Sequence, residues 1–209
     1  MVCLVGLTLP VQAASIQQLT LERTEEGLFL SSVIDLELGQ AVEDALLRSV
    51  PIYFVAQAEV LRERWYWSDR RVASASRTYR LAYQPLTRRW RVSVSSGSGP
   101  GVGLQYALHQ NHASLAQALA TITRQSDWTL AEASRLEAGA AYRVDYRFKL
   151  DMALLPRPFQ LGMNAQTDWN LDLRHSLDVP AQVSIDKAGA DKDPDPSGAG
   201  GGTPSGKTP

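Results

Sequence analysis

The three histidines are the first candidates for metal or acid–base chemistry. His109 and His112 are three residues apart, close to the start of an expected helix, where they could share one face. A zinc site needs further ligands, and no histidine or acidic partner stands at a recognisable spacing from this pair. His175 is isolated near the end of the folded part. The sequence therefore predicts no metal site and no cofactor.

Other catalytic signatures are absent or incomplete. The only cysteine, Cys3, lies in a segment that we expect to be removed, which leaves no thiol for a disulfide, a nucleophile or a metal. The glycine-rich run Ser96–Gly103 lacks the spacing of a nucleotide-binding loop, and we predict a plain loop there. No Gly-x-Ser-x-Gly elbow is present. Asp145 and Asp151 are predicted on the outer face of a strand, but a glycosidase pair from distant strands stays open as an alternative.

Arginines and aromatic residues gather in the segment Pro51–Ser95. Its nine arginines are accompanied by only three acidic residues, Glu59, Glu63 and Asp69. Such a surface could bind lipid headgroups, polyanions or an acidic protein. The candidate binding residues are Trp65, Tyr66, Trp67, Arg70, Arg71, Arg88 and Arg89.

A structural interpretation of the same segment is also open. Arginine stems can cover apolar surface, and charged side chains at a sheet edge prevent pairing between molecules. Large aromatic residues mainly serve burial in a core. The whole chain has a formal net charge of −1, whereas nucleic-acid-binding domains are usually strongly basic, so no nucleic-acid partner is predicted.

Alternation of apolar and polar residues predicts the fold class. In Ile52–Leu61 and Tyr142–Asp151 every second residue is apolar, as in half-buried strands. Two short helices are expected, one at 40–50 and one from a Ser114 cap to about Arg124. Further strands are expected at 16–23, 28–38, 73–83, 90–94, 128–133 and 169–173. We therefore predict a mainly β chain that forms an antiparallel β-sandwich-like domain with two short helices.

Composition divides the chain into three parts. Its 209 residues, 44% hydrophobic and 21% charged, suffice for one globular domain, which we place at 14–180. Residues 1–13 are apolar and end in Val-Gln-Ala, which predicts a signal peptide cleaved after Ala13, although the usual basic start is missing. Residues 186–209 are rich in Gly, Pro, Asp, Lys and Ser, which predicts a disordered tail. No segment is long enough for a transmembrane helix.

Several short motifs follow one another between Ala14 and Arg174. They are Pro51-Ile52-Tyr53-Phe54, Arg64-Trp65-Tyr66-Trp67, Arg77-Thr78-Tyr79-Arg80-Leu81, Leu108-His109-Gln110, Leu155-Pro156 and Asp168-Trp169-Asn170-Leu171. Together they resemble a proteobacterial family of exported proteins that carry a domain of unknown function. Some members are labelled proline-rich signal peptide proteins, and members are often encoded beside a two-component sensor kinase. The resemblance implies an envelope location, a link to envelope signalling and no established activity.

These observations favour a non-enzymatic accessory protein of the cell envelope, located in the periplasm. It would bind an envelope protein or a membrane-proximal anionic ligand through the arginines and aromatics of Pro51–Ser95. Two alternatives remain. One is a hydrolase of envelope glycans, and the other is a carrier that holds a small molecule or lipid between its sheets. The oligomeric state is not predicted.

Overall fold

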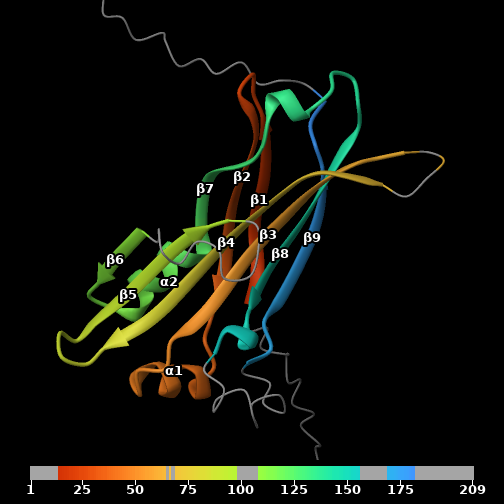
Figure 1. Ribbon diagram of the computed structural model, residues 1–209. Coiled ribbons are helices and arrows are strands. Elements are labelled where there is room, and N and C mark those ends of the chain that lie inside the picture. The colour runs from red at the N-terminus through yellow and green to blue at the C-terminus, as the bar shows by residue number, and fades with distance from the viewer. Residues whose placement is uncertain (1–13, 65, 67–68, 98–107, 156–168, 182–209) are drawn as a thin grey trace, which may run out of the picture.

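The computed structural model describes residues 14–64, 66, 69–97, 108–155 and 169–181, which form two antiparallel sheets (Figure 1). The three-stranded sheet has the order β1-β2-β7, with β1 at Ala14–Arg23, β2 at Gly27–Leu36 and β7 at Arg124–Glu132. The six-stranded sheet has the order β6-β5-β4-β3-β8-β9. Its strands are β3 (Ile52–Arg62), β4 (Arg70–Gln84), β5 (Arg89–Ser96), β6 (Leu108–His112), β8 (Tyr142–Leu150) and β9 (Asp172–Asp178). The predicted mainly β, sandwich-like class is confirmed.

Side-chain alternation along β3 and β8 sets the register of the large sheet. The inner face of β3 carries five residues with almost no exposure, namely Ile52, Phe54, Ala56, Ala58 and Val60. Phe54 lies opposite Tyr79 of β4 on one side and Leu150 of β8 on the other. A shift of one residue would turn every one of these side chains to solvent, so burial fixes the pairing.

Alanines in the centre of the inner face leave room for large neighbours. Ala58 pairs with Ala75 of β4 and with Tyr146 of β8. Phe54 and Phe148 stack with their ring centroids 5.9 Å apart. Small residues on β3 and β4 thus accommodate aromatic side chains from the other strands within one core, as close packing requires.

Both predicted helices are present. The helix α1 (Gln40–Leu47) buries Val42, Ala45 and Leu46. The helix α2 (Leu115–Thr123) begins after Ser114. The Ser114 side chain accepts a hydrogen bond from the backbone N–H of Gln117, as the side chain of an N-cap residue does. It contacts β2, β5, β6 and β7, and therefore fills one side of the space between the sheets. No helix in the described ranges is long and apolar enough to cross a membrane.

The structure corrects two local predictions. The last strand is Asp172–Asp178 and not 169–173, because Trp169 precedes the strand as a buried anchor, 2% exposed. The segment with His109 and His112 is strand β6, not the start of a helix, so the two rings point to opposite faces. His109 contacts Ser93 of β5, and His112 contacts Thr121 of α2. The predicted signal peptide, the glycine-rich run after Gly97 and the predicted tail lie outside the described residues.

A few polar side chains are buried between the sheets. Gln125 of β7 donates through Nε2 to Tyr146 Oη over 3.3 Å, and both residues are at most 3% exposed. Burial raises the pKa of Tyr146 to about 12, although the nearby Ser32 hydroxyl and the Gln125 amide oppose part of that rise. Burial also raises the pKa of Tyr79, against the influence of Arg77. These tyrosines therefore favour the folded state only while they keep their protons.

We expect the domain to lose stability between about pH 10 and pH 12. An unfolded tyrosine ionises near its ordinary pKa of about 10, whereas Tyr146 stays protonated until about pH 12 in the fold. Its contribution is complete below pH 10 and is lost as the pH rises through that window. Tyr146→Phe should reduce the pH slope of the free energy of unfolding by up to about 1.4 kcal/mol per pH unit. Urea titrations along a pH series measure this slope. Tyr66→Phe, at an exposed site, is the control, and equal slopes for both variants would contradict the argument.

The position of β7 depends on the absence of a side chain at Gly27. A Cβ atom there would lie 2.3 Å from the carbonyl oxygen of Ala131 in β7. Gly27→Ala should therefore push β7 away from β2 at a cost of about 1–3 kcal/mol, and speed amide hydrogen exchange in β7. Gly139→Ala is the comparison, because its Cβ would meet open space and only backbone strain at φ +74° would result. An unchanged urea midpoint and exchange rate for Gly27→Ala would disprove the close approach.

Candidate functional site

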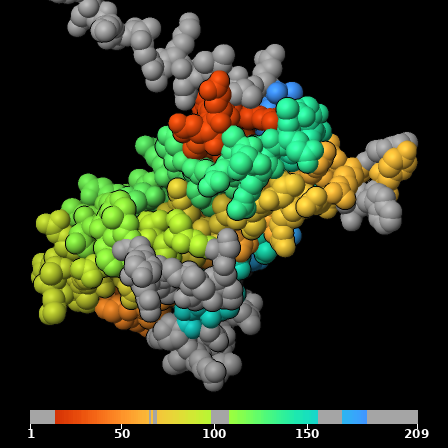
Figure 2. Space-filling view, turned by 45° about the horizontal axis from the view of Figure 1, so that its top comes forward, coloured from red at the N-terminus to blue at the C-terminus, as the bar shows by residue number. Residues whose placement is uncertain are grey.

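The arginines that the sequence suggested as binding residues fall into two groups, which are separated by the length of β4. Arg70 and Arg71 begin β4, whereas Arg88 and Arg89 lie in and after the turn that ends it. A strand of 15 residues extends over about 46 Å. In Figure 2 the end of the β3–β4 hairpin and the β4–β5 turn are at opposite ends of the molecule. One small ligand therefore cannot contact both pairs.

The end of the β3–β4 hairpin projects beyond the neighbouring strands (Figure 1). Tyr66 lies there with 70% of its surface exposed. Trp65 and Trp67, the other two aromatic candidates, are outside the described residues. Arg71 forms an ion pair with Glu59 over 2.8 Å. The charge of this candidate region is thus partly compensated on its own hairpin.

The other end of β4 carries arginines with no acidic partner. Arg88 and Arg89 are exposed, while Arg80 and Arg91 are half-buried. Within the described part of the chain, none of these four forms an ion pair. Arg91 donates through Nε to the Asn111 side-chain oxygen over 3.2 Å, a neutral acceptor. Positive charge is therefore left uncompensated on this part of the sheet.

Strand pairing sets these side chains in rows across the outer face. Arg80 of β4 lies opposite Ser93 of β5, which lies opposite His109 of β6. In the next row Arg91 of β5 lies beside Asn111 of β6, and Arg89 follows at the start of β5. We call the group Arg80, Arg88, Arg89, Arg91 and His109 the basic face.

The sequence signal for the basic face lies in the distribution of charge along the chain and not in any single motif. From Arg70 to Ser126 there are eight arginines and no aspartate or glutamate. This segment supplies β4, β5, β6 and α2, so one end of the fold is built without acids. The near-neutral charge of the whole chain hides this segregation, because the acids lie elsewhere.

Acids gather instead on the opposite half of the large sheet, where they bind basic partners. Asp172 of β9 accepts from Arg147 of β8 through two bonds of 2.7 Å and from Arg174 over 2.9 Å. The Arg147 and Arg174 guanidinium groups hold the pKa of Asp172 far below its usual range. Asp145 accepts from Ser176 over 2.7 Å. These carboxylates connect β8 to β9.

The chemistry available on the basic face is recognition of anions. Arginine presents a rigid fork of donors that matches carboxylate and phosphate oxygens. Ser93 Oγ and His109 Nδ1 are 2.8 Å apart, which is within reach for a nucleophile and its base. Ser93 is only 3% exposed, however, and its segment contains no acid that could orient His109. Among the described residues there is also no group of three or more His, Cys, Asp or Glu able to hold a metal.

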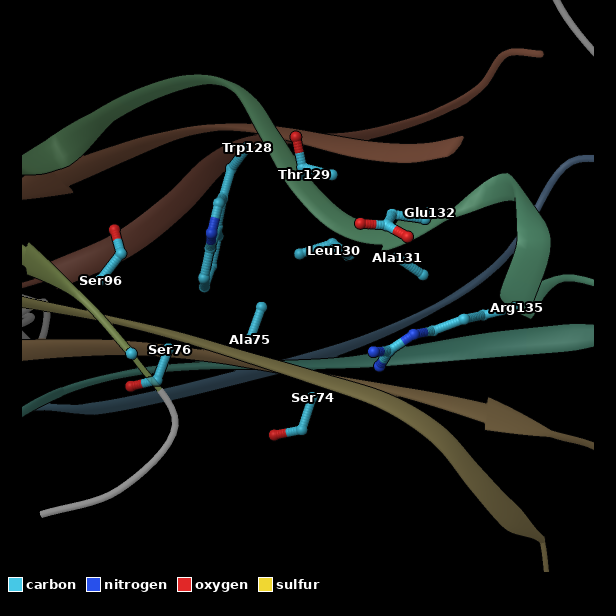
Figure 3. Close-up of a pocket in the computed structure, with 11 residues that line it drawn as sticks. Ser74, Ala75, Ser76, Ser96, Trp128, Thr129, Leu130, Ala131, Glu132 and Arg135 are labelled. Carbon is cyan, nitrogen blue, oxygen red and sulfur yellow. The ribbon is translucent and has the colours of Figure 1, made fainter. Parts of the chain in front are cut away.

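A separate groove lies between the two sheets, with a volume of about 290 Å³. Trp128 and Arg135 stand at its two ends in Figure 3, with Ala75, Leu130 and Ala131 between them. Arg77 of β4 lies over the Trp128 ring, 5.1 Å from its centroid. The remaining lining residues are Ser74, Ser76, Ser96, Gly97, Thr129 and Glu132. The groove is thus apolar in its centre and polar at its rim.

Comparison with known proteins matches one family model to most of the chain. The model describes a Domain of unknown function (DUF4390) and matches residues 11–177, which include every strand and helix described above except the last residue of β9. No curated protein and no solved structure matched. The match covers far more than half of the sequence, and the chain belongs to the DUF4390 family, a domain of unknown function.

Proposed function

We propose that this protein is an exported, non-enzymatic accessory module of the cell envelope, which binds anionic lipid headgroups through the basic face. The observation that carries the proposal is the set of arginines on β4 and β5 that have no acidic partner among the described residues. An anionic membrane attracts such residues by about 1 kcal/mol for each one near its surface. The periplasm remains the proposed location.

The geometry favours a broad charged surface over an enclosed site. Arg88 and Arg89 are exposed where the chain turns from β4 into β5. The rows of Arg80 and Arg91 continue the charge along the outer face. A surface of this kind contacts several headgroups at once and requires no deep pocket.

Lipid binding should depend on the arginines at one end of β4 only. Replacement of both Arg88 and Arg89 by Ser should weaken binding of the full chain to vesicles that contain phosphatidylglycerol by about 2 kcal/mol, or roughly 30-fold. Replacement of both Arg70 and Arg71 by Ser removes the same charge from the other end of β4 and is the matched control. Vesicle co-sedimentation at low salt measures both, and phosphatidylcholine vesicles give the uncharged reference. Equal losses for the two double variants, or no binding to either vesicle, would contradict the proposal.

The identity of the first residue of the mature protein tests the proposed export. The strand β1 begins at Ala14, which pairs with Leu36, so cleavage after Ala13 leaves the described fold complete. We expect the protein recovered from the periplasm to begin at Ala14, and Ala13→Asp to block processing because signal peptidase requires a small residue there. Mass spectrometry of the intact chain decides the matter. An uncleaved protein confined to the cytoplasm would rule out the proposed location.

A further inference from the structure

The two sheets differ in width, and this leaves part of the large sheet without a covering strand. Three strands and α2 face six strands. Among the described residues β7 is an edge strand, paired with β2 on one side only. The helix α2 leads directly into β7 at Arg124 and contacts β5 and β6. The groove described above lies along the last five residues of β7 and faces β4.

The residues that line the groove show which part of β7 it exposes. They include five consecutive residues, Trp128 to Glu132. Trp128, Leu130 and Ala131 are buried, because a bulge at Leu130 turns two successive residues inward, whereas Thr129 and Glu132 are exposed. A cavity that touches both sets of residues runs along the edge of the strand. The edge carries the backbone N–H and C=O groups that pair with a further strand. The groove is therefore shaped for main-chain recognition.

The size of the groove selects an extended occupant. A helix with its side chains is about 10 Å wide, and a strand is added at a spacing of about 4.8 Å. A volume of about 290 Å³ accepts one or two side chains of an extended segment and not a helix face. In Figure 3 the space over Ala75 and Leu130, between Trp128 and Arg135, is the position for an apolar side chain.

The charges around the groove select an acidic segment. Arg135 lines the groove at one end, and Trp128 lines the other end, where Arg77 lies over its ring without lining the groove itself. Neither arginine forms an ion pair within the described ranges, and β4 contains no acid. Glu132 is the single acidic residue in the lining. An extended segment that places an acidic residue beside Arg135 and an apolar one next to it would complement this arrangement.

We infer that the groove binds an extended acidic segment of a partner protein, which adds a strand to the free edge of β7. Main-chain hydrogen bonds along Trp128–Glu132 would provide affinity, as in other cases of strand addition. An apolar side chain over Ala75 and an acidic one beside Arg135 would provide selectivity. This surface is distinct from the basic face, which uses the outer side of the same sheet.

The probe is a fluorescent hexapeptide of alternating valine and glutamate, acetylated and amidated at its ends, and the experiment uses the full chain. We expect fluorescence anisotropy to show at least tenfold tighter binding of this peptide than of its valine–lysine counterpart. A version with N-methylated backbone amides should bind at least tenfold more weakly, because it cannot pair with β7. Equal binding of the N-methylated peptide, or no binding of any peptide up to about 1 mM, overturns the inference.

Two variants place the peptide in the groove. Ala75→Trp fills the space beside Trp128, and Arg135→Glu reverses the charge at the other end, so each should weaken binding at least tenfold. Arg174→Glu, on β9 at the far edge of the large sheet, is the matched control and should bind as the original chain does. If the Ala75→Trp variant fails to fold, the Arg135→Glu variant alone tests whether the peptide binds in the groove. Unchanged binding in Arg135→Glu overturns the inference.

Hydrogen exchange locates the added strand. Amides of residues 129–132 should exchange more slowly with the valine–glutamate peptide present, and protection confined to other strands overturns the inference. A second copy of this chain is the competing occupant of the groove. If the chain dimerises in analytical ultracentrifugation and Ala75→Trp abolishes the dimer, the occupant is a second copy and not a partner protein, which overturns the inference. The variant with Arg88 and Arg89 changed to Ser should bind the peptide normally, so failure of lipid binding and failure of peptide binding are separate results.

Discussion

Burial of the inner face of the six-stranded sheet is the constraint on which the rest of this structure depends. Along β3 every second side chain is enclosed, and β4 and β8 supply matching apolar residues on both sides. At about 25 cal/mol per Å² of apolar surface removed from water, such a face must be covered. The strands β1, β2 and β7 cover one part and α2 covers another. The groove beside Trp128 lies where this cover ends.

Charge is arranged on the outer face of the same sheet according to which strands meet there. In the β8–β9 half, acids form ion pairs with basic side chains, as Asp172 does with Arg147 over 2.7 Å. Exposed pairs of this kind usually contribute less than about 1 kcal/mol to stability, and their effect here is mainly to remove net charge from that half. The β4–β6 half contains arginines without acids. A chain of formal net charge −1 can therefore present one strongly basic surface.

Much of the fold could be predicted from the sequence, because long strands with one buried face keep a strict two-residue period. The strands β3 and β8 have this period, and Ser114, a typical N-cap residue, indicated where α2 begins. The strand β6 could not be predicted, since its sequence Leu-His-Gln-Asn-His has no apolar period and its pairing to β5 decides its conformation. Trp169 was wrongly placed inside the last strand because burial alone does not distinguish a strand residue from an anchor before it.

The candidate site was harder to predict than the fold, for a geometric reason. Arg70 and Arg88 are close in sequence but at opposite ends of β4, so a cluster in the sequence became two regions in space. The groove left no signal, because Ala75, Trp128 and Arg135 are brought together only when the sheets pack. Both features share β4, whose successive residues face opposite sides: Arg80 points outward and Arg77 inward toward Trp128. The groove uses the first half of β4 and the basic face its second half. They also share β5, which supplies Ser96 to the groove and Arg89 and Arg91 to the basic face. An occupant of one therefore leaves the other accessible, and coupling between them would pass along β4 and β5.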